Sequence, residues 1–136
     1  METQFYMHLD FPARARVEAH LRYSPDTPLS VEITFDLGAG STPVVWILGR
    51  ELLRDGLSGP AGMGDVQIDP TAPGSRTLRL RLHSPGGIAE FRVPGQALED
   101  FLGRTAKAVP YGREAEAPGF LAGLDRALAS MLTEPR

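Results

Sequence analysis

Cysteine is absent from this 136-residue sequence, and lysine occurs only once, at Lys107. Without cysteine the chain can form no disulfide, no zinc–thiolate site and no thiol nucleophile. The formal net charge of −3 is too small to predict a polyanionic partner. No apolar run reaches the roughly 18–20 residues that span a membrane, and the N-terminus lacks the basic and apolar segments of a signal peptide. We therefore expect a cytoplasmic protein with no transmembrane segment.

Most of the first 93 residues alternate between apolar and polar side chains, a pattern typical of antiparallel strands with one buried face. The apolar stretch 44–48 contains the only tryptophan and is predicted to be a central strand covered on both faces. Leu29 and Leu37 are expected to point inward at the ends of their strand. In all, about seven strands are predicted, at 4–9, 14–22, 29–37, 44–48, 65–69, 77–83 and 88–93.

Helical patterns follow the strands and interrupt them once. Residues 50–55 form a predicted short helix that ends at Gly56 as its C-cap. Pro94 suits the first position of a second helix. The last twenty residues have a wide apolar stripe at helical spacing, in which the candidates for core or intersubunit packing are Leu124, Leu128 and Met131. The order of strands and then helices predicts a single α+β domain over residues 1–136.

No pattern in the chain predicts catalysis, a metal or a cofactor. The glycine-rich loop 59–65 lacks the Gly-Lys-Ser/Thr ending of a phosphate-binding loop and leads into a strand rather than a helix. The histidines His8, His20 and His83 lie far apart in the sequence, all on polar strand faces. No serine lies in a nucleophile-elbow pattern. We expect a protein that is not an enzyme and has no small-molecule substrate.

Arginines on two predicted strands offer an alternative function. If the strands share a surface, these arginines could follow a single-stranded nucleic-acid backbone, with Tyr6 available for stacking. The net negative charge, together with Glu18 and Glu90 in the same regions, favours an ordinary solvated face instead. The alternative nucleic-acid face consists of Arg14, Arg16, Arg22, Arg79 and Arg81.

Four motifs together resemble the SsgA-like proteins, sporulation and cell-division regulators of filamentous actinobacteria. They are RELLRDGL at 50–57, GPAGMGDVQIDP at 59–70, LHSPGGIAEF at 82–91 and LEDFLGRTAKAVPYGRE at 98–114. They occur in the family's order and spacing, and the resemblance covers residues 21–114.

The resemblance implies a non-enzymatic protein that acts at cell-division septa and recruits the tubulin-like division protein FtsZ, alone or with another SsgA-like protein. It also implies a bell-shaped homotrimer whose antiparallel sheet is similar to the Whirly-type single-stranded nucleic-acid binders. For contact with a partner protein we predict three charged residues beside the family motifs, which we expect to be exposed: Arg50, Arg54 and Glu114.

Overall fold

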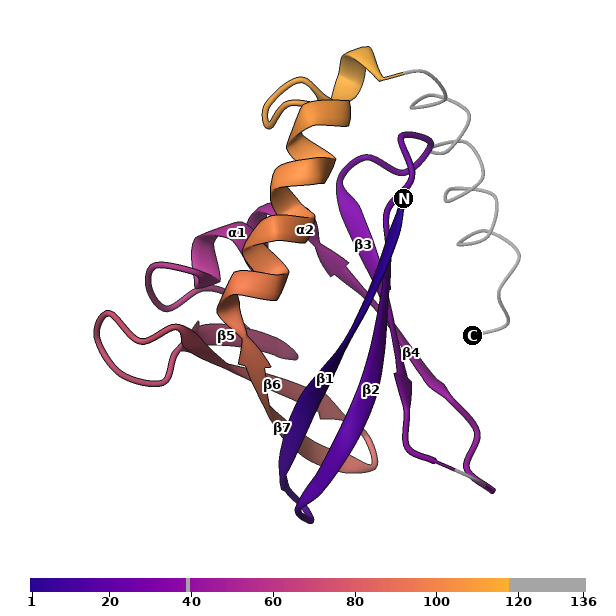
Figure 1. The fold of residues 1–136 in the computed structure, drawn as a ribbon, viewed down its shortest axis with the longest axis vertical. Helices are drawn as coiled ribbons and strands as arrows, with labels where there is room; N and C mark the ends of the chain where they lie inside the picture. Colours follow the sequence, from indigo (N-terminus) through magenta and orange to yellow (C-terminus); the bar gives the residue numbers. More distant parts are fainter. Residues whose placement is uncertain (39, 118–136) are drawn as a thin grey trace.

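The computed structural model describes residues 1–38 and 40–117, which form one antiparallel sheet and two α-helices. Seven strands lie in the order β4-β3-β2-β1-β7-β6-β5 (Figure 1). The strands are β1 (Glu2–Phe11), β2 (Ala15–Arg22), β3 (Ser30–Asp36), β4 (Val44–Gly49), β5 (Val66–Pro70), β6 (Thr77–Ser84) and β7 (Gly87–Pro94). The helices are α1 (Arg50–Gly56) and α2 (Gly95–Ala108), followed by a 3₁₀ turn at Glu114–Glu116. The predicted α+β class with seven antiparallel strands is confirmed.

The sheet is strongly curled. Two strands, β2 and β1, separate β3 from β7, a separation of about 14 Å in a flat sheet. The rings of Phe35 on β3 and Phe91 on β7 nevertheless stack, with their centroids 4.6 Å apart. The curl therefore makes one face concave, and α2 lies against that face (Figure 1).

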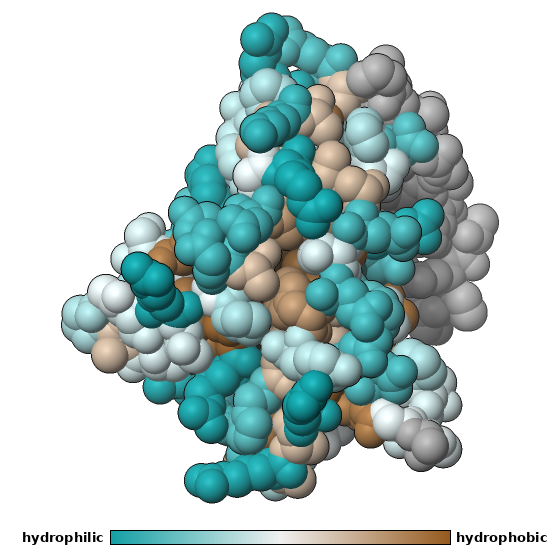
Figure 2. All heavy atoms as spheres, in the orientation of Figure 1, coloured by the Kyte–Doolittle hydropathy of each residue, from teal (hydrophilic) through white to brown (hydrophobic). Residues whose placement is uncertain are grey.

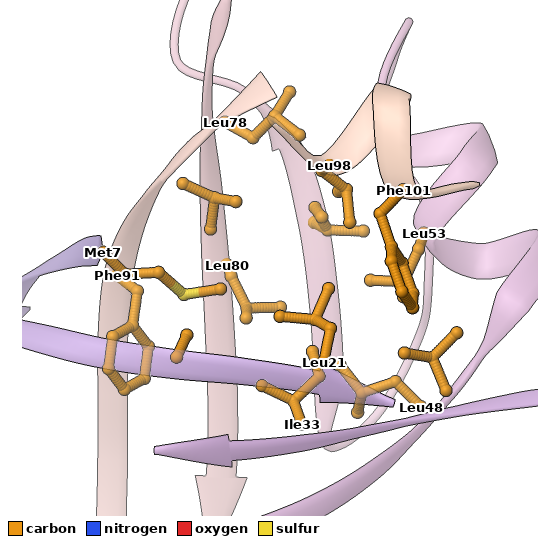
Figure 3. Packing of buried hydrophobic residues seen from close by; sticks show 14 of the residues in the cluster. Met7, Leu21, Ile33, Leu48, Leu53, Leu78, Leu80, Phe91, Leu98 and Phe101 are labelled. Atoms are coloured by element: carbon orange, nitrogen blue, oxygen red, sulfur yellow. The ribbon is translucent and has the colours of Figure 1, made fainter. Parts of the chain in front are cut away.

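The alternation of side chains along each strand decides what enters the core. Every second residue points to the concave face, and each of the seven strands has at least one buried residue there. Leu53 on α1 and Leu98 and Phe101 on α2 point toward the sheet residues Leu21 and Leu48 (Figure 3). Each such side chain stabilises the fold by about 1.5–3 kcal/mol when fully buried. The apolar face predicted for the second helix is confirmed.

The apolar stretch 44–48 is an edge strand, so the prediction of a central strand is wrong. Among the described strands, β4 has β3 as its one neighbour. Leu48 is buried, but Val45 and Ile47 are 54% and 68% exposed on the face away from α2. An apolar run shows that a strand is suited to burial but does not say where the strand lies in the sheet.

Two strand ends also differ from the prediction. Leu29 and Leu37 are exposed because β3 covers only Ser30–Asp36 and the chain turns away at both ends. Pro94 is the cap before α2 rather than its first residue. These are differences of one residue in the bounds of each element.

Gly56 is needed for close packing rather than as a helix C-cap, which corrects the prediction. It is the last residue of α1 and does not have the positive φ of a left-handed cap. A methyl group on its Cα would overlap the side chain of Ile68 on β5. The absence of a side chain therefore lets α1 approach the sheet.

Replacing Gly56 with alanine is expected to lower the free energy of unfolding by about 1–3 kcal/mol, because the added methyl group would push α1 away from β5. The matched control is Gly103→Ala in α2, where nothing lies within 4 Å of the added Cβ. Alanine at that helical position is expected to stabilise the protein by about 0.5–1 kcal/mol. Urea denaturation measures both changes, and effects of the same sign would contradict the close approach at Gly56.

Candidate functional site

Arg50 occupies the junction between the sheet and both helices. It is the first residue of α1, and its side chain is 0% exposed. Its Nη1 donates hydrogen bonds to the backbone carbonyls of Thr105 at 3.3 Å and Val109 at 2.6 Å, at the end of α2. Its Nη2 donates to Oε1 of Glu114 at 2.8 Å. One guanidinium group thus connects α1, α2 and the 3₁₀ turn.

The chemistry of the guanidinium group suits this position. The last carbonyls of a helix have no partners within the helix and carry partial negative charge. Arginine presents several N–H donors in a rigid planar fork, so Arg50 can bond two carbonyls and a carboxylate at once. A buried cation without an anionic partner is strongly destabilising, which explains why a glutamate faces it.

Glu114 is the anionic partner of this buried cation. It is only 7% exposed. The hydrogen bond from Arg50 is the main cause that lowers the pKa of Glu114, against the opposing effect of burial. The carboxylate is therefore held in its charged form beside the guanidinium.

Two tyrosines complete the surroundings of Arg50. Its guanidinium carbon lies 4.2 Å from the ring centroid of Tyr111 and 5.2 Å from that of Tyr23, distances at which a cation is attracted to an aromatic ring. The hydroxyl of Tyr23 donates to the carbonyl of Pro28 at 2.9 Å. Burial is the largest cause that raises the pKa of both tyrosines. Sequence reasoning missed both rings, because no spacing connects either of them to Arg50.

The three residues predicted to contact a partner differ in exposure. The expectation that Arg50 and Glu114 are exposed is wrong, because they form a buried ion pair that joins the helices. Arg54 is accessible: its side chain is 40% exposed, bonded to Asp55 at 3.0 Å and placed 4.4 Å from the ring centroid of Tyr111. The packing candidates Leu124, Leu128 and Met131 lie outside the described residues.

The arginines of the alternative nucleic-acid face lie on one side of the sheet. In the strand register, His8 on β1 lies opposite Arg16 on β2 and opposite Arg92 on β7. Side chains at these three positions therefore point to the same face of the sheet. The guanidinium carbon of Arg16 lies 3.7 Å from the ring centroid of Tyr6. The register gives Arg16, Arg22, Arg79 and Arg81 the face opposite α2, and Arg14 is exposed just before β2.

Carboxylates neutralise much of this face. Glu90 lies between two of the arginines, with its oxygens 3.1 Å from Nε of Arg79 and 3.6 Å from Nη2 of Arg81. Arg92 binds Asp10 at 2.9 Å, and this hydrogen bond is the main cause that lowers the pKa of Asp10. A nucleic-acid phosphate that bound Arg79, Arg81 or Arg92 would therefore have to displace a carboxylate.

The described part of the chain contains neither a candidate metal site nor a helix that could span a membrane. Within residues 1–38 and 40–117, no group of three or more potential metal-ligating side chains comes together. His8 and His20 each contact one nearby carboxylate, of Asp10 and Glu18. The helices of this part are too short or too polar to cross a membrane.

Hydrophilic residues cover most of the side of the molecule on which α2 lies, and hydrophobic residues are visible in the gaps between them (Figure 2).

Replacing Glu114 with alanine is expected to lower the free energy of unfolding by about 3 kcal/mol, because it leaves the buried Arg50 without its counter-ion. The control is Glu116→Ala, which removes an exposed ion pair with Arg113 and should cost no more than about 1 kcal/mol. Thermal and urea unfolding of the two variants measure the contrast. A Glu114 variant as stable as the Glu116 variant would contradict a structural role for the buried pair.

Comparison with known proteins places these features in a family. The family model "Streptomyces sporulation and cell division protein, SsgA" matches residues 17–114, which include most of β2, the strands β3 to β7, both helices and Glu114. The sporulation-specific cell division protein SsgB of Frankia casuarinae is 42% identical over 117 residues, which cover 85% of this chain and 78% of the relative.

Two solved structures have the same fold. One comes from a study that correlates mutations in SsgB with longitudinal cell division during sporulation of Streptomyces coelicolor; it has a TM-score of 0.77 and 36% identity and covers 85% of this chain and 92% of that one. The other is an SsgA-like sporulation-specific cell division protein from Thermobifida fusca, with a TM-score of 0.78, 33% identity and coverage of 96% and 94%. The chain therefore belongs to the SsgA family of sporulation and cell-division proteins.

Proposed function

We propose that the protein is a non-enzymatic adaptor that helps to bring the tubulin-like division protein FtsZ to septa formed during sporulation. The observation that supports this most is its identity of 42% to a sporulation-specific cell division protein SsgB, over 85% of the chain. In this proposal it acts in the cytoplasm at the septum as a homotrimer with a Whirly-like sheet. FtsZ, another SsgA-like protein, or both together are its partners.

An adaptor needs an accessible surface, and the buried Arg50 and Glu114 cannot provide one. We assign partner contact to Arg54 and to Met63 in the loop that follows α1. Met63 is 91% exposed and lies between Gly62 and Gly64, which both have positive φ. A methionine displayed in this way can adapt to an apolar depression on a partner.

The loop that displays Met63 is firmly attached to the sheet. Ala61 and Ile68 exchange two backbone hydrogen bonds, of 2.8 and 3.0 Å. A methyl group on Gly62 would overlap the carbonyl of Val66, so the backbone passes very close to β5. A loop anchored in this way loses little conformational entropy when a partner binds, which favours affinity.

The nucleic-acid alternative has less support. The sheet arginines share a face, but Glu90 and Asp10 bind three of the arginines on it. The formal charge of the whole chain is −3. Binding that depended on this face would fall steeply with salt, by roughly 0.7 log units per log unit of salt for each phosphate contacted.

The adaptor proposal is tested by cosedimentation of the purified protein with FtsZ polymers. The wild-type protein is expected to pellet with polymer, and the double variant Arg54→Glu/Met63→Asp is expected to lose most of this binding while its melting temperature stays within a few degrees of wild type, because both changes are on the surface. The control is Arg22→Glu, an exposed arginine on the opposite sheet face, which should pellet normally.

A parallel titration with a fluorescent single-stranded oligonucleotide separates the two functions. No pelleting of wild type, together with salt-sensitive oligonucleotide binding that Arg22→Glu weakens, would overturn the adaptor and favour the sheet face. Pelleting that the double variant retains would keep the adaptor but overturn the assignment to Arg54 and Met63.

A further inference from the structure

The two edges of the sheet differ in how they are protected. An edge strand presents unpaired backbone N–H and C=O groups that another strand can bind, so sheets usually cover or block their edges. At one edge, Ala61 forms a bridge to Ile68 of β5 by two backbone hydrogen bonds, of 2.8 and 3.0 Å. At the other edge, β4 has no neighbour beyond β3 among residues 1–38 and 40–117 (Figure 1). The edge formed by β4 is therefore the open one in this part of the chain.

The backbone groups of Val45 and Ile47 point out of this open edge. Hydrogen-bonded and non-bonded pairs alternate along an antiparallel ladder. Directly after β4, the N–H of Arg50 donates to the carbonyl of Leu29 at 2.8 Å, and this pair continues the register of β4 with β3. The even-numbered residues of β4 therefore bond to β3. The N–H and C=O groups of Val45 and Ile47 are left for a further strand.

The strand β4 also lacks the features that usually block an edge, which are charged side chains, proline and bulges. It reads VVWILG, without a charge or a proline, and its register with β3 is continuous. Val45 and Ile47 are exposed on the face away from α2. On the concave face, Val44 and Trp46 line an apolar hollow of about 510 Å³. An open edge that is apolar on both faces marks a place where another strand pairs.

The strand that best fits beside β4 is uncharged and apolar on both faces, because its side chains would lie next to those of β4 on each face. Among the described strands, β4 is the one with this composition. Its register is also self-complementary. In an antiparallel pair centred on Trp46, Val45 of each copy lies opposite Ile47 of the other, and these outward-pointing residues can exchange both backbone bonds. No like charges lie opposite each other in such a pair.

We propose that β4 pairs antiparallel with β4 of a second copy of the chain, with Trp46 opposite Trp46 and Val45 opposite Ile47, so that one sheet continues through both copies. This contact has two-fold symmetry. The copies of the proposed homotrimer are related by a three-fold axis, so the β4 contact would join one trimer to another. It goes beyond the adaptor function and applies whether the basic unit is a monomer or a trimer.

Sedimentation velocity of the purified chain tests the contact. Ile47→Lys places a charge on the open edge and is expected to reduce the mass of the assembly to about half that of wild type or less. The control is Ile88→Lys, the same change at an exposed residue of β7, which lies between β1 and β6, and it should keep the wild-type mass. Circular dichroism checks that both variants are folded. An Ile47→Lys variant with the mass of wild type, or an equal loss of mass in both variants, would overturn the proposal.

Disulfide cross-linking tests the register and needs no added charge. Because the chain has no cysteine, Val45→Cys and Ile47→Cys each carry a single thiol. In the proposed pair, position 45 of one copy lies opposite position 47 of the other, within the Cα separation that a disulfide spans. Mild oxidation of an equal mixture of the two variants is expected to give mainly the mixed disulfide, with much less dimer from either variant alone. No cross-link in the mixture, or equally strong cross-linking of each variant alone, would contradict the proposed pairing.

Discussion

The buried positive charge of Arg50 lies where the sheet, both helices and the 3₁₀ turn meet. The guanidinium of Arg50 is removed from water, so its charge and its Nη1 and Nη2 donors need partners, which several elements supply at once. The end of α2 supplies two carbonyls and the 3₁₀ turn supplies the carboxylate of Glu114. This one group therefore connects the start of α1, the end of α2 and the 3₁₀ turn.

The curl of the sheet and the contacts of Arg50 together determine which part of the concave face is covered. Curling brings Phe35 and Phe91 into contact and makes a concave face, but α2 alone covers only the part of it nearest Arg50. Gly56 lets α1 close the same end against β5. The result is a well-packed end around the ion pair and an apolar hollow at the other end.

This arrangement changes what the family's charged motifs can do. Arg50 and Glu114 form a buried ion pair that connects the helices, so substituting either residue is expected to lower stability. The exposed features that remain beside the motifs are Arg54, whose guanidinium lies over Tyr111, and Met63 on an anchored loop. On the sheet face, Glu90 and Asp10 pair with three of the arginines.

Much of the fold could be predicted from the sequence because its signals are local. Alternation in β2 and β6 identified the buried faces, and the spacing of Leu98, Phe101 and Leu102 identified the face of α2. Strand order could not be predicted, and so the apolar stretch at β4 was assigned to the centre when it lies at the edge.

The site was harder to predict for the same reason. Arg50 and Glu114 are 64 residues apart, and no periodicity shows that two charged residues meet in the interior. Both residues lie in the family motifs, but their charge suggested exposure, whereas both are buried. Tyr23 and Tyr111 contribute through their rings, and nothing in the sequence pattern distinguishes them from tyrosines on the surface.

The most direct test of this account is a double-mutant cycle on Arg50→Met and Glu114→Gln, measured by urea unfolding of the wild type, both single variants and the double variant. If the buried pair holds the helices together, the two changes are strongly coupled, and the double variant is more stable than the sum of the single effects predicts by about 2 kcal/mol. Additivity within about 0.5 kcal/mol is the behaviour of independent sites, and that result would contradict the central role of the Arg50–Glu114 pair.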